Sequence, residues 1–198
     1  NFRGVGNSTG AATSKDDLLT DSIAQVQRLL DLGVTPHHIT LKGQSLGSGI
    51  ATLTAAHFHQ QGIEINLFNG RSFSSLTNVV VGQIRTFGND NGHETSFRKK
   101  ILGWLATPFI KVALLLSNWE INADSAYRQV LSKNREYLVV RSPDEQLAHN
   151  VVDDEVITHY GSLHAALSSS EQHSDSKMVV NDDPSYGGHN VDLSDLRQ

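Results

Sequence analysis

Hydrophobic positions in the first third of the chain alternate between helical and strand-like spacing. Apolar residues recur at helical spacing from Leu19 to Leu30, after a serine and two aspartates that are typical of a helix start. The short β-branched run 38–41 predicts a strand, 50–58 is again helical, and 64–70 predicts a second strand. The order strand, helix, strand predicts a right-handed parallel unit, so the fold class is α/β.

The middle of the chain has a different pattern, in which helical spacing dominates. A short stretch at 79–81 is the one candidate strand in this region. The most apolar run of the chain, 101–116, contains Pro108 and Lys111 and is short for a membrane span. We expect it to form either a buried helix or a pair of helices that Pro108 separates.

The last third returns to a mixture of strands and helix. We expect strands at 135–140 and 178–180, a helix around 162–167, and a polar linker from Ser168 to Lys177.

These patterns divide the chain into three segments. Residues 1–70 form a first core segment, 71–135 a helical insertion, and 136–198 a second core segment.

Composition excludes several classes of protein. The 198 residues are 38% hydrophobic and 19% charged, which is typical of a soluble globular chain. A formal net charge of −5 argues against nucleic acid as a partner, because phosphate binding needs clustered Lys and Arg. Without cysteine the chain has no disulfide, thiol nucleophile or thiolate zinc site.

The segment from Gly43 to Gly47 matches G-x-S-x-G and lies where the first strand should turn into a helix. This context is that of a nucleophile elbow, with Ser45 as the nucleophile in a strained backbone conformation. We expect side chains at 43 and 47 to collide with the neighbouring strand and helix, so that only small residues fit. The backbone N–H of Leu46 is the expected first oxyanion-hole donor.

A serine of this kind needs a base, which in elbow-type enzymes follows an acid late in the chain. His189 follows the last expected strand and two glycines. His57, His59 and His164 fall on expected helices, where surface or packed roles are expected. His189 is therefore the predicted base.

The acid has more than one candidate. Asp154 is followed by an apolar anchor and an expected helix, whose dipole would favour the ionised carboxylate. Asp144 lies closer to the third strand and stays open, with Asp153 as a third option. We prefer Asp154.

Other site chemistries lack their motifs. The glycines from 43 to 49 are not followed by the Lys-Ser/Thr end of a phosphate-binding loop. His37-His38 and His57-x-His59 have no carboxylates at metal-ligand spacing. We expect neither a cofactor nor a metal.

Three segments resemble the α/β-hydrolase superfamily and occur in its order: Asn-Phe-Arg-Gly-Val-Gly-Asn-Ser at 1–8, the elbow at 43–47, and Gly-Gly-His-Asn at 187–190. The first is similar to the Arg-Gly-x-Gly-x-Ser loop after the family's fourth strand. Within the superfamily the chain looks closest to abhydrolase-domain serine hydrolases and to effector-type, hydrolase-like proteins of intracellular bacteria.

The resemblance implies an α/β-hydrolase fold in which Ser45 attacks a carboxylic ester, thioester or amide. It implies that His189 acts as general base and then acid, that Asp154 orients it, and that the insertion 71–135 is a lid over the site. The family's first four strands, and the loop carrying its second oxyanion donor, have no counterpart in these residues. We therefore expect the elbow strand to be a sheet edge and the missing part to exist in the full-length protein.

Two functions from different classes follow. The first is a serine hydrolase acting on an acyl ester or thioester, lipid esters included. The alternative is a catalytically silent hydrolase fold that binds a partner or a membrane surface through its apolar lid. The intact elbow favours the first, and the absent oxyanion loop favours the second.

Overall fold

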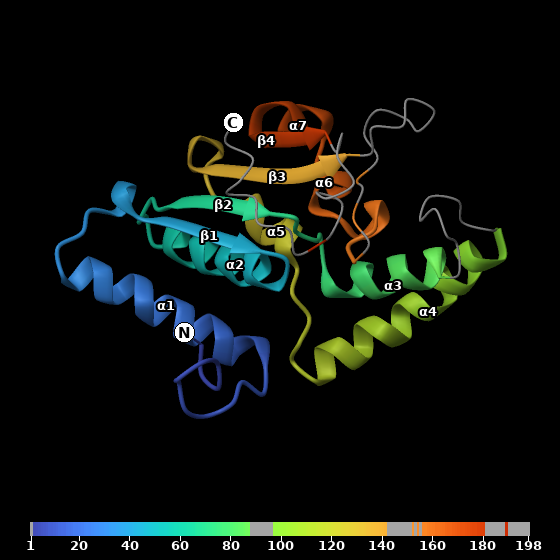
Figure 1. Ribbon diagram of the computed structural model, residues 1–198, viewed down its shortest axis with the longest axis horizontal. Helices are drawn as coiled ribbons and strands as arrows, with labels where there is room; N and C mark the ends of the chain where they lie inside the picture. The colour runs from blue at the N-terminus through green and yellow to red at the C-terminus, as the bar shows by residue number, and fades with distance from the viewer. Residues whose placement is uncertain are drawn as a thin grey trace.

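The computed structural model describes residues 2–87, 97–141, 152, 154, 156–180 and 189. Within these residues the chain forms a parallel sheet with helices packed around it (Figure 1). The sheet has the order β1-β2-β3-β4, with β1 (Thr40–Gln44), β2 (Asn66–Gly70), β3 (Arg135–Arg141) and β4 (Ser176–Val180). Each neighbouring pair is parallel, and Gln44 of β1 pairs with Gly70 of β2. The predicted parallel α/β sheet is confirmed, and β1 is an edge of its described part.

Two helices cover one face of the first strands. Helix α1 (Lys15–Asp31) begins where predicted, because the side chain of Ser14 accepts a hydrogen bond from the Asp17 N–H. Helix α2 (Leu46–Gln60) contacts α1 as well as β1 and β2 (Figure 1). Many α2 positions are small and buried, which allows close packing against the strands. A short 3₁₀ turn, η1 (Pro36–His38), leads from α1 into β1.

The region between β2 and β3 is helical, and the strand predicted at 79–81 is wrong. These residues belong to α3 (Leu76–Thr86), which starts at Ser75, whose side chain accepts a hydrogen bond from the Asn78 N–H. Helix α4 (Phe97–Leu116) packs against α3, and the short α5 (Ala123–Tyr127) and η2 (Ser132–Asn134) lead to β3.

Helix α4 also differs from its prediction. It continues through Pro108 as one helix and is not buried, since Gly103 is its one buried residue. Proline lacks the N–H for one helical hydrogen bond, but one such loss does not end a helix that packs against a neighbour. No helix among the described residues is long and apolar enough to span a membrane.

The prediction of a polar linker from Ser168 to Lys177 is also wrong. This stretch contains α7 (Ser169–Asp175) and the start of β4, after η3 (His159–Gly161) and α6 (Leu163–Ala166). A capping box between Ser168 and Glu171 starts α7. The buried Asp175 then accepts a 2.8 Å hydrogen bond from Nε of Arg135, which joins α7 to β3.

A buried aromatic cluster fills the space beside β3. The Tyr137 hydroxyl lies 2.8 Å from Nδ1 of His164, and both side chains are almost fully buried. Burial raises the pKa of Tyr137 to about 12. His164 is therefore a packed residue of the core, as its place in the sequence indicated.

Candidate active site

Ser45 lies at the tight turn between β1 and α2, as its motif predicts. Its backbone has φ 53° and ψ −121°, a conformation that side-chain-bearing residues rarely adopt. Its N–H donates a 3.0 Å hydrogen bond to the carbonyl oxygen of Gly70, which continues the β1–β2 pairing through the turn. A strained residue that the surrounding hydrogen bonds hold in place is typical of a functional site.

The two motif glycines differ in how closely they are packed. A Cβ added at Gly43 would overlap the carbonyl of Gly47 and lie 2.6 Å from Cα of Ser48, so glycine is required there. A Cβ at Gly47 would meet no described atom within 4 Å, so the expected collision at this position is wrong. The second tight contact is at Gly49, where a Cβ would lie 2.8 Å from the Phe73 ring.

Ser48 fixes the first turn of α2 to the end of β2. Its buried hydroxyl donates to the carbonyl oxygen of Gly70 at 2.8 Å and accepts from the Gly70 N–H at 3.1 Å. This residue was not predicted as part of the site, because a serine in a glycine-rich turn gives no signal of its own. These bonds hold the elbow against β2. Leu46 is the first residue of α2, where backbone N–H groups lack intrahelical partners.

The structure brings His189 and Asp154 together. Nδ1 of His189 lies 2.9 Å from both Oδ1 and Oδ2 of Asp154, and the exposed fractions of the two side chains are 6% and 3%. A carboxylate only accepts hydrogen bonds, so Nδ1 carries a proton, and in the neutral imidazole the lone pair is then on Nε2. This tautomer is the one that a general base facing a serine requires.

His189 lies at the same end of the sheet as Ser45. The side chain of Gln44, the residue before Ser45, donates a 2.7 Å hydrogen bond to the carbonyl oxygen of His189. Ser45 follows β1, and His189 comes after β4 in the chain. Because carboxyl ends of parallel strands meet at one edge, residues distant in sequence gather there.

Asp154 is held by backbone N–H groups and not by a helix start. Its Oδ1 accepts hydrogen bonds from the N–H groups of Val156 and Ile157, at 2.9 and 2.8 Å. The next described helical element is the short η3 at 159–161, so the expected helix dipole does not act at this carboxylate. The turn itself fixes the acid in place.

Arg71 is a second site residue that was not predicted from the sequence. It follows β2 directly, has φ 46°, and its side chain is 1% exposed. Its NH1 lies 3.7 Å from Oδ2 of Asp154, so a buried cation lies beside one carboxylate oxygen while the amides of the turn bind the other. Its place at the carboxyl end of a strand is the signal that could have identified it.

The remaining candidates lie elsewhere. Asp144 and Asp153 are outside the described residues. His57 and His59 are half-buried on the outer part of α2 and hydrogen-bond within their surroundings, His57 with Gln61 and His59 with the carbonyl of Ile65. No cluster of metal-ligating side chains forms in the described part of the chain.

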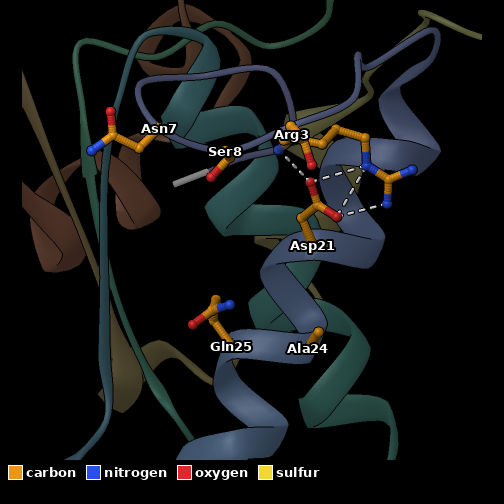
Figure 2. Close-up of a pocket in the computed structure, with 7 residues that line it drawn as sticks. Arg3, Asn7, Ser8, Asp21, Ala24 and Gln25 are labelled. Carbon is orange, nitrogen blue, oxygen red and sulfur yellow. Dashed lines mark hydrogen bonds and ion pairs between the residues drawn. The ribbon is translucent and has the colours of Figure 1, made fainter.

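The loop that resembles the Arg-Gly-x-Gly-x-Ser segment lines a polar depression of about 440 Å³ against α1 (Figure 2). In Figure 2 Arg3 turns toward Asp21, and its guanidinium bonds this aspartate at 2.6 Å and Asp17 at 2.8 Å. Ser45, Asp154 and His189 do not line this depression. Because two carboxylates on α1 neutralise Arg3, the loop acts here as an anchor for the first helix.

Comparison with known proteins places this geometry in a known fold. No family model matches the chain, and no curated sequence is similar to it. An alpha-beta hydrolase from Vibrio vulnificus, however, superposes on 96% of the chain with 18% identity and a TM-score of 0.56. The chain has an α/β-hydrolase fold. It spans 55% of the Vibrio vulnificus chain.

Two further α/β-type structures are similar to this α/β-hydrolase fold. The α/β fold family hydrolase from Bacillus anthracis str. Sterne matches 96% of this chain with 14% identity and a TM-score of 0.46. The match includes 74% of the Bacillus anthracis chain. A structure described with carboxylesterases of Nitrososphaera gargenis matches 91% of this chain with 17% identity and a TM-score of 0.37. The match includes 68% of the Nitrososphaera gargenis chain.

Proposed function

We propose that this chain carries the catalytic residues of a serine hydrolase that cleaves an acyl ester or thioester. The observation that carries the proposal is the buried pair in which Nδ1 of His189 lies 2.9 Å from Asp154. A hydrogen bond from Gln44, the residue before Ser45, ties His189 to the end of β1, and the positive φ of Ser45 is typical of a nucleophile elbow. An α/β-hydrolase fold whose chain carries a serine, then an aspartate, then a histidine supports acyl transfer.

In this proposal Ser45 Oγ attacks the acyl carbonyl carbon while Nε2 of His189 takes its proton. Asp154 stabilises the imidazolium that forms, and the Leu46 N–H donates to the oxyanion. Collapse of the tetrahedral intermediate breaks the bond to the leaving alcohol or thiol, which takes the proton from His189. Water then attacks the acyl-enzyme with the same histidine as base, and Ser45 is released.

Arg71 is a positioning residue in this mechanism. Its buried guanidinium lies 3.7 Å from Oδ2 of Asp154 and forms an ion pair with the carboxylate that the histidine faces. The amides of Val156 and Ile157 hold the same carboxylate from another direction. With several donors converging on it, Asp154 keeps one orientation toward Nδ1.

We further propose that α3 and α4, within the insertion 71–135, form the lid. Its support is the packing of α3 on the turn that follows Asp154. A Cβ at Gly161 would lie 2.9 Å from the carbonyl oxygen of Asn78, so η3 and α3 approach as closely as backbone allows. The narrower resemblance to effector-type proteins stays a prediction.

A fluorophosphonate probe tests the proposal in the full-length protein. We expect covalent labelling at Ser45 and none in Ser45→Ala. We expect Asp154→Asn to lower kcat by about four orders of magnitude with little change in KM, because the wrong histidine tautomer is then stabilised. Asp31→Asn, on the exposed end of α1, is the matched control and should leave kcat unchanged.

Two results would contradict this function. Labelling that persists in Ser45→Ala would place the nucleophile elsewhere. A folded full-length protein that neither reacts with the probe nor hydrolyses p-nitrophenyl or thioester substrates of any acyl length would favour the silent binding module.

A further inference from the structure

Helix α4 presents a broad apolar face to solvent. Its inner stripe includes Gly103, Ala106 and Ile110 and packs against α3, where a Cβ at Gly103 would lie 2.7 Å from Cγ of Arg85. The outer face carries nine large apolar side chains that are exposed: Phe97, Ile101, Leu102, Trp104, Leu105, Phe109, Val112, Leu115 and Leu116. Figure 1 shows α4 beside α3, with its carboxyl end near the start of α1, where the Lys15 N–H bonds the carbonyl of Asn118.

The exposure of this face is large. Trp104 is 75% and Phe109 77% exposed, whereas the apolar residues of the sheet core are almost fully buried. An apolar patch of this extent on a protein surface marks a site of interaction. The remaining step is to identify what covers it.

Charge on the same helix identifies the occupant. From Phe97 to Asn118 the sequence contains Arg98, Lys99, Lys100 and Lys111 and no aspartate or glutamate. This segment therefore has a net charge of +4, within a chain whose net charge is −5. A strongly basic helix with an apolar face is matched by a partner that has anionic groups at its surface and an apolar layer below them. An anionic lipid bilayer has both properties.

The arrangement of the side chains fits the bilayer interface. Lys100 and Lys111 are separated by about three helical turns, so they lie along one flank of the apolar face. Lysines at such a flank extend their charged ends to lipid head groups while their stems cover apolar surface. Trp104 lies next to this flank on the same side of the helix, and indole prefers the head-group region.

We propose that α4 is a binding surface for anionic lipid bilayers, on which it lies parallel to the membrane plane with the Trp104 and Phe109 face inserted. The proposal does not depend on the hydrolase activity, because none of its residues belongs to the Ser45, Asp154 and His189 set.

Co-sedimentation of the full-length protein with vesicles tests this surface. The vesicles are phosphatidylcholine alone or with about one-third phosphatidylserine. We expect binding to the anionic vesicles and much weaker binding to phosphatidylcholine. Because each basic residue near an anionic surface contributes about fivefold in affinity, Arg98→Gln/Lys100→Gln/Lys111→Gln should weaken binding about 100-fold.

One double variant tests the apolar contribution of α4, and two single variants elsewhere on the surface are its controls. Trp104→Ser/Phe109→Ser should abolish vesicle binding without lowering Tm, since both side chains lie outside the core. Leu32→Ser, at an apolar residue that is 71% exposed beyond α1, is the matched apolar control and should bind normally. Lys133→Gln, at an exposed lysine near β3, is the matched charge control. Brominated lipids should quench Trp104 fluorescence on binding.

The opposite results overturn the proposal. Binding that the α4 variants leave unchanged would place the lipid contact elsewhere, and absence of binding to anionic vesicles would exclude it. A concentration-dependent dimer that Trp104→Ser/Phe109→Ser dissociates, without vesicle binding, would show that a second copy covers the face. Ser45→Ala should bind vesicles as the wild type does, so loss of the hydrolase proposal leaves this one standing.

Discussion

The strained conformation of Ser45 depends on close packing at a single neighbouring glycine. Gly43 lies in β1, and any Cβ there would press on the backbone of Gly47 and Ser48 at the first turn of α2. The turn can be this tight only because the strand offers no side chain at that point. Gly47, on the other side of Ser45, has open space beside it.

We therefore expect Gly43→Ala to destabilise the protein by about 1–3 kcal/mol, because backbone atoms cannot move aside as a side chain can. Gly47→Ala should be neutral or stabilise by up to about 1 kcal/mol, since alanine is the better helix former. Urea unfolding of the two variants measures both free energies. Equal losses would show that the second glycine is constrained by something other than the space beside it.

Arg71 shows which part of the site is not readable at the residue scale. In the sequence it is a single arginine after a glycine, and its place at the end of an expected strand is the one signal that separates it from a surface residue. Its contact with Asp154 spans more than eighty positions and exists because β2 ends where the acid turn passes. The pairing of Asp154 with His189 was predictable only because a motif fixed their order in advance.

At the scale of elements, the sequence predicted helices that bury an apolar stripe and missed those held by polar contacts. Helix α7 was expected as linker because Ser, Glu, Gln and His give it no apolar periodicity. Its capping box at Ser168 and Glu171 was readable, but its buried contact is the ion pair from Asp175 to Arg135. Local patterns do not reveal a polar face whose partner lies on a distant strand.

The opposite error occurred at 79–81, where three valines have strand propensity. The Ser75 cap and the packing of α3 against α4 outweigh that propensity, since a Cβ at Gly103 would lie 3.4 Å from Cγ1 of the buried Val81. Tertiary packing commonly overrides a propensity difference of a few tenths of a kcal/mol per residue. Strand β3 was predictable because its residues 137–140 are an apolar, buried run. Strand β1 has no buried position and was identified by the short β-branched run before the motif.

Glu171 should make the stability of α7 depend on pH. Burial alone would raise its pKa, but hydrogen bonds from Ser168 and the charges of Arg128 and Arg135 outweigh burial, so the pKa is lowered. A carboxylate whose pKa is lowered by folding stabilises the protein above its unfolded pKa, about 4.3, and this stabilisation is lost as the pH falls through the folded pKa.

We expect Glu171→Gln to lower the unfolding free energy by about 1 kcal/mol at pH 7. The difference from wild type should shrink as the pH is lowered from about 5 to about 3, where the wild-type carboxylate takes up its proton. Urea unfolding across this pH range measures it. A difference that does not change with pH would show that the capping hydrogen bonds, and not the charge, carry the stabilisation.

At the scale of the whole molecule, one apolar cluster holds the elements of the site together. It joins α1, α2, the segment after β2 and the acid turn: Leu18, Ile50, Phe73, Ile121, Ala123 and Ile157. The larger cluster beneath the sheet fixes α2 against the strands. The elements of the site are therefore held by these two apolar clusters together. Helix α3 contacts the site through the residues that follow Asp154.

The contact of Gly161 with α3 should couple the helical pair to the acid turn. A Cβ there would lie 2.9 Å from the carbonyl oxygen of Asn78 and 3.1 Å from Cα of Val79. We expect Gly161→Ala to lower the unfolding free energy by about 1–3 kcal/mol and to speed amide exchange at 156–161, because backbone must separate from backbone. Gln83→Met removes the 2.6 Å hydrogen bond from α3 to the Val156 carbonyl without a clash, and should cost no more than about 1 kcal/mol. Unchanged exchange at 156–161 in Gly161→Ala would show that α3 moves independently of the acid turn.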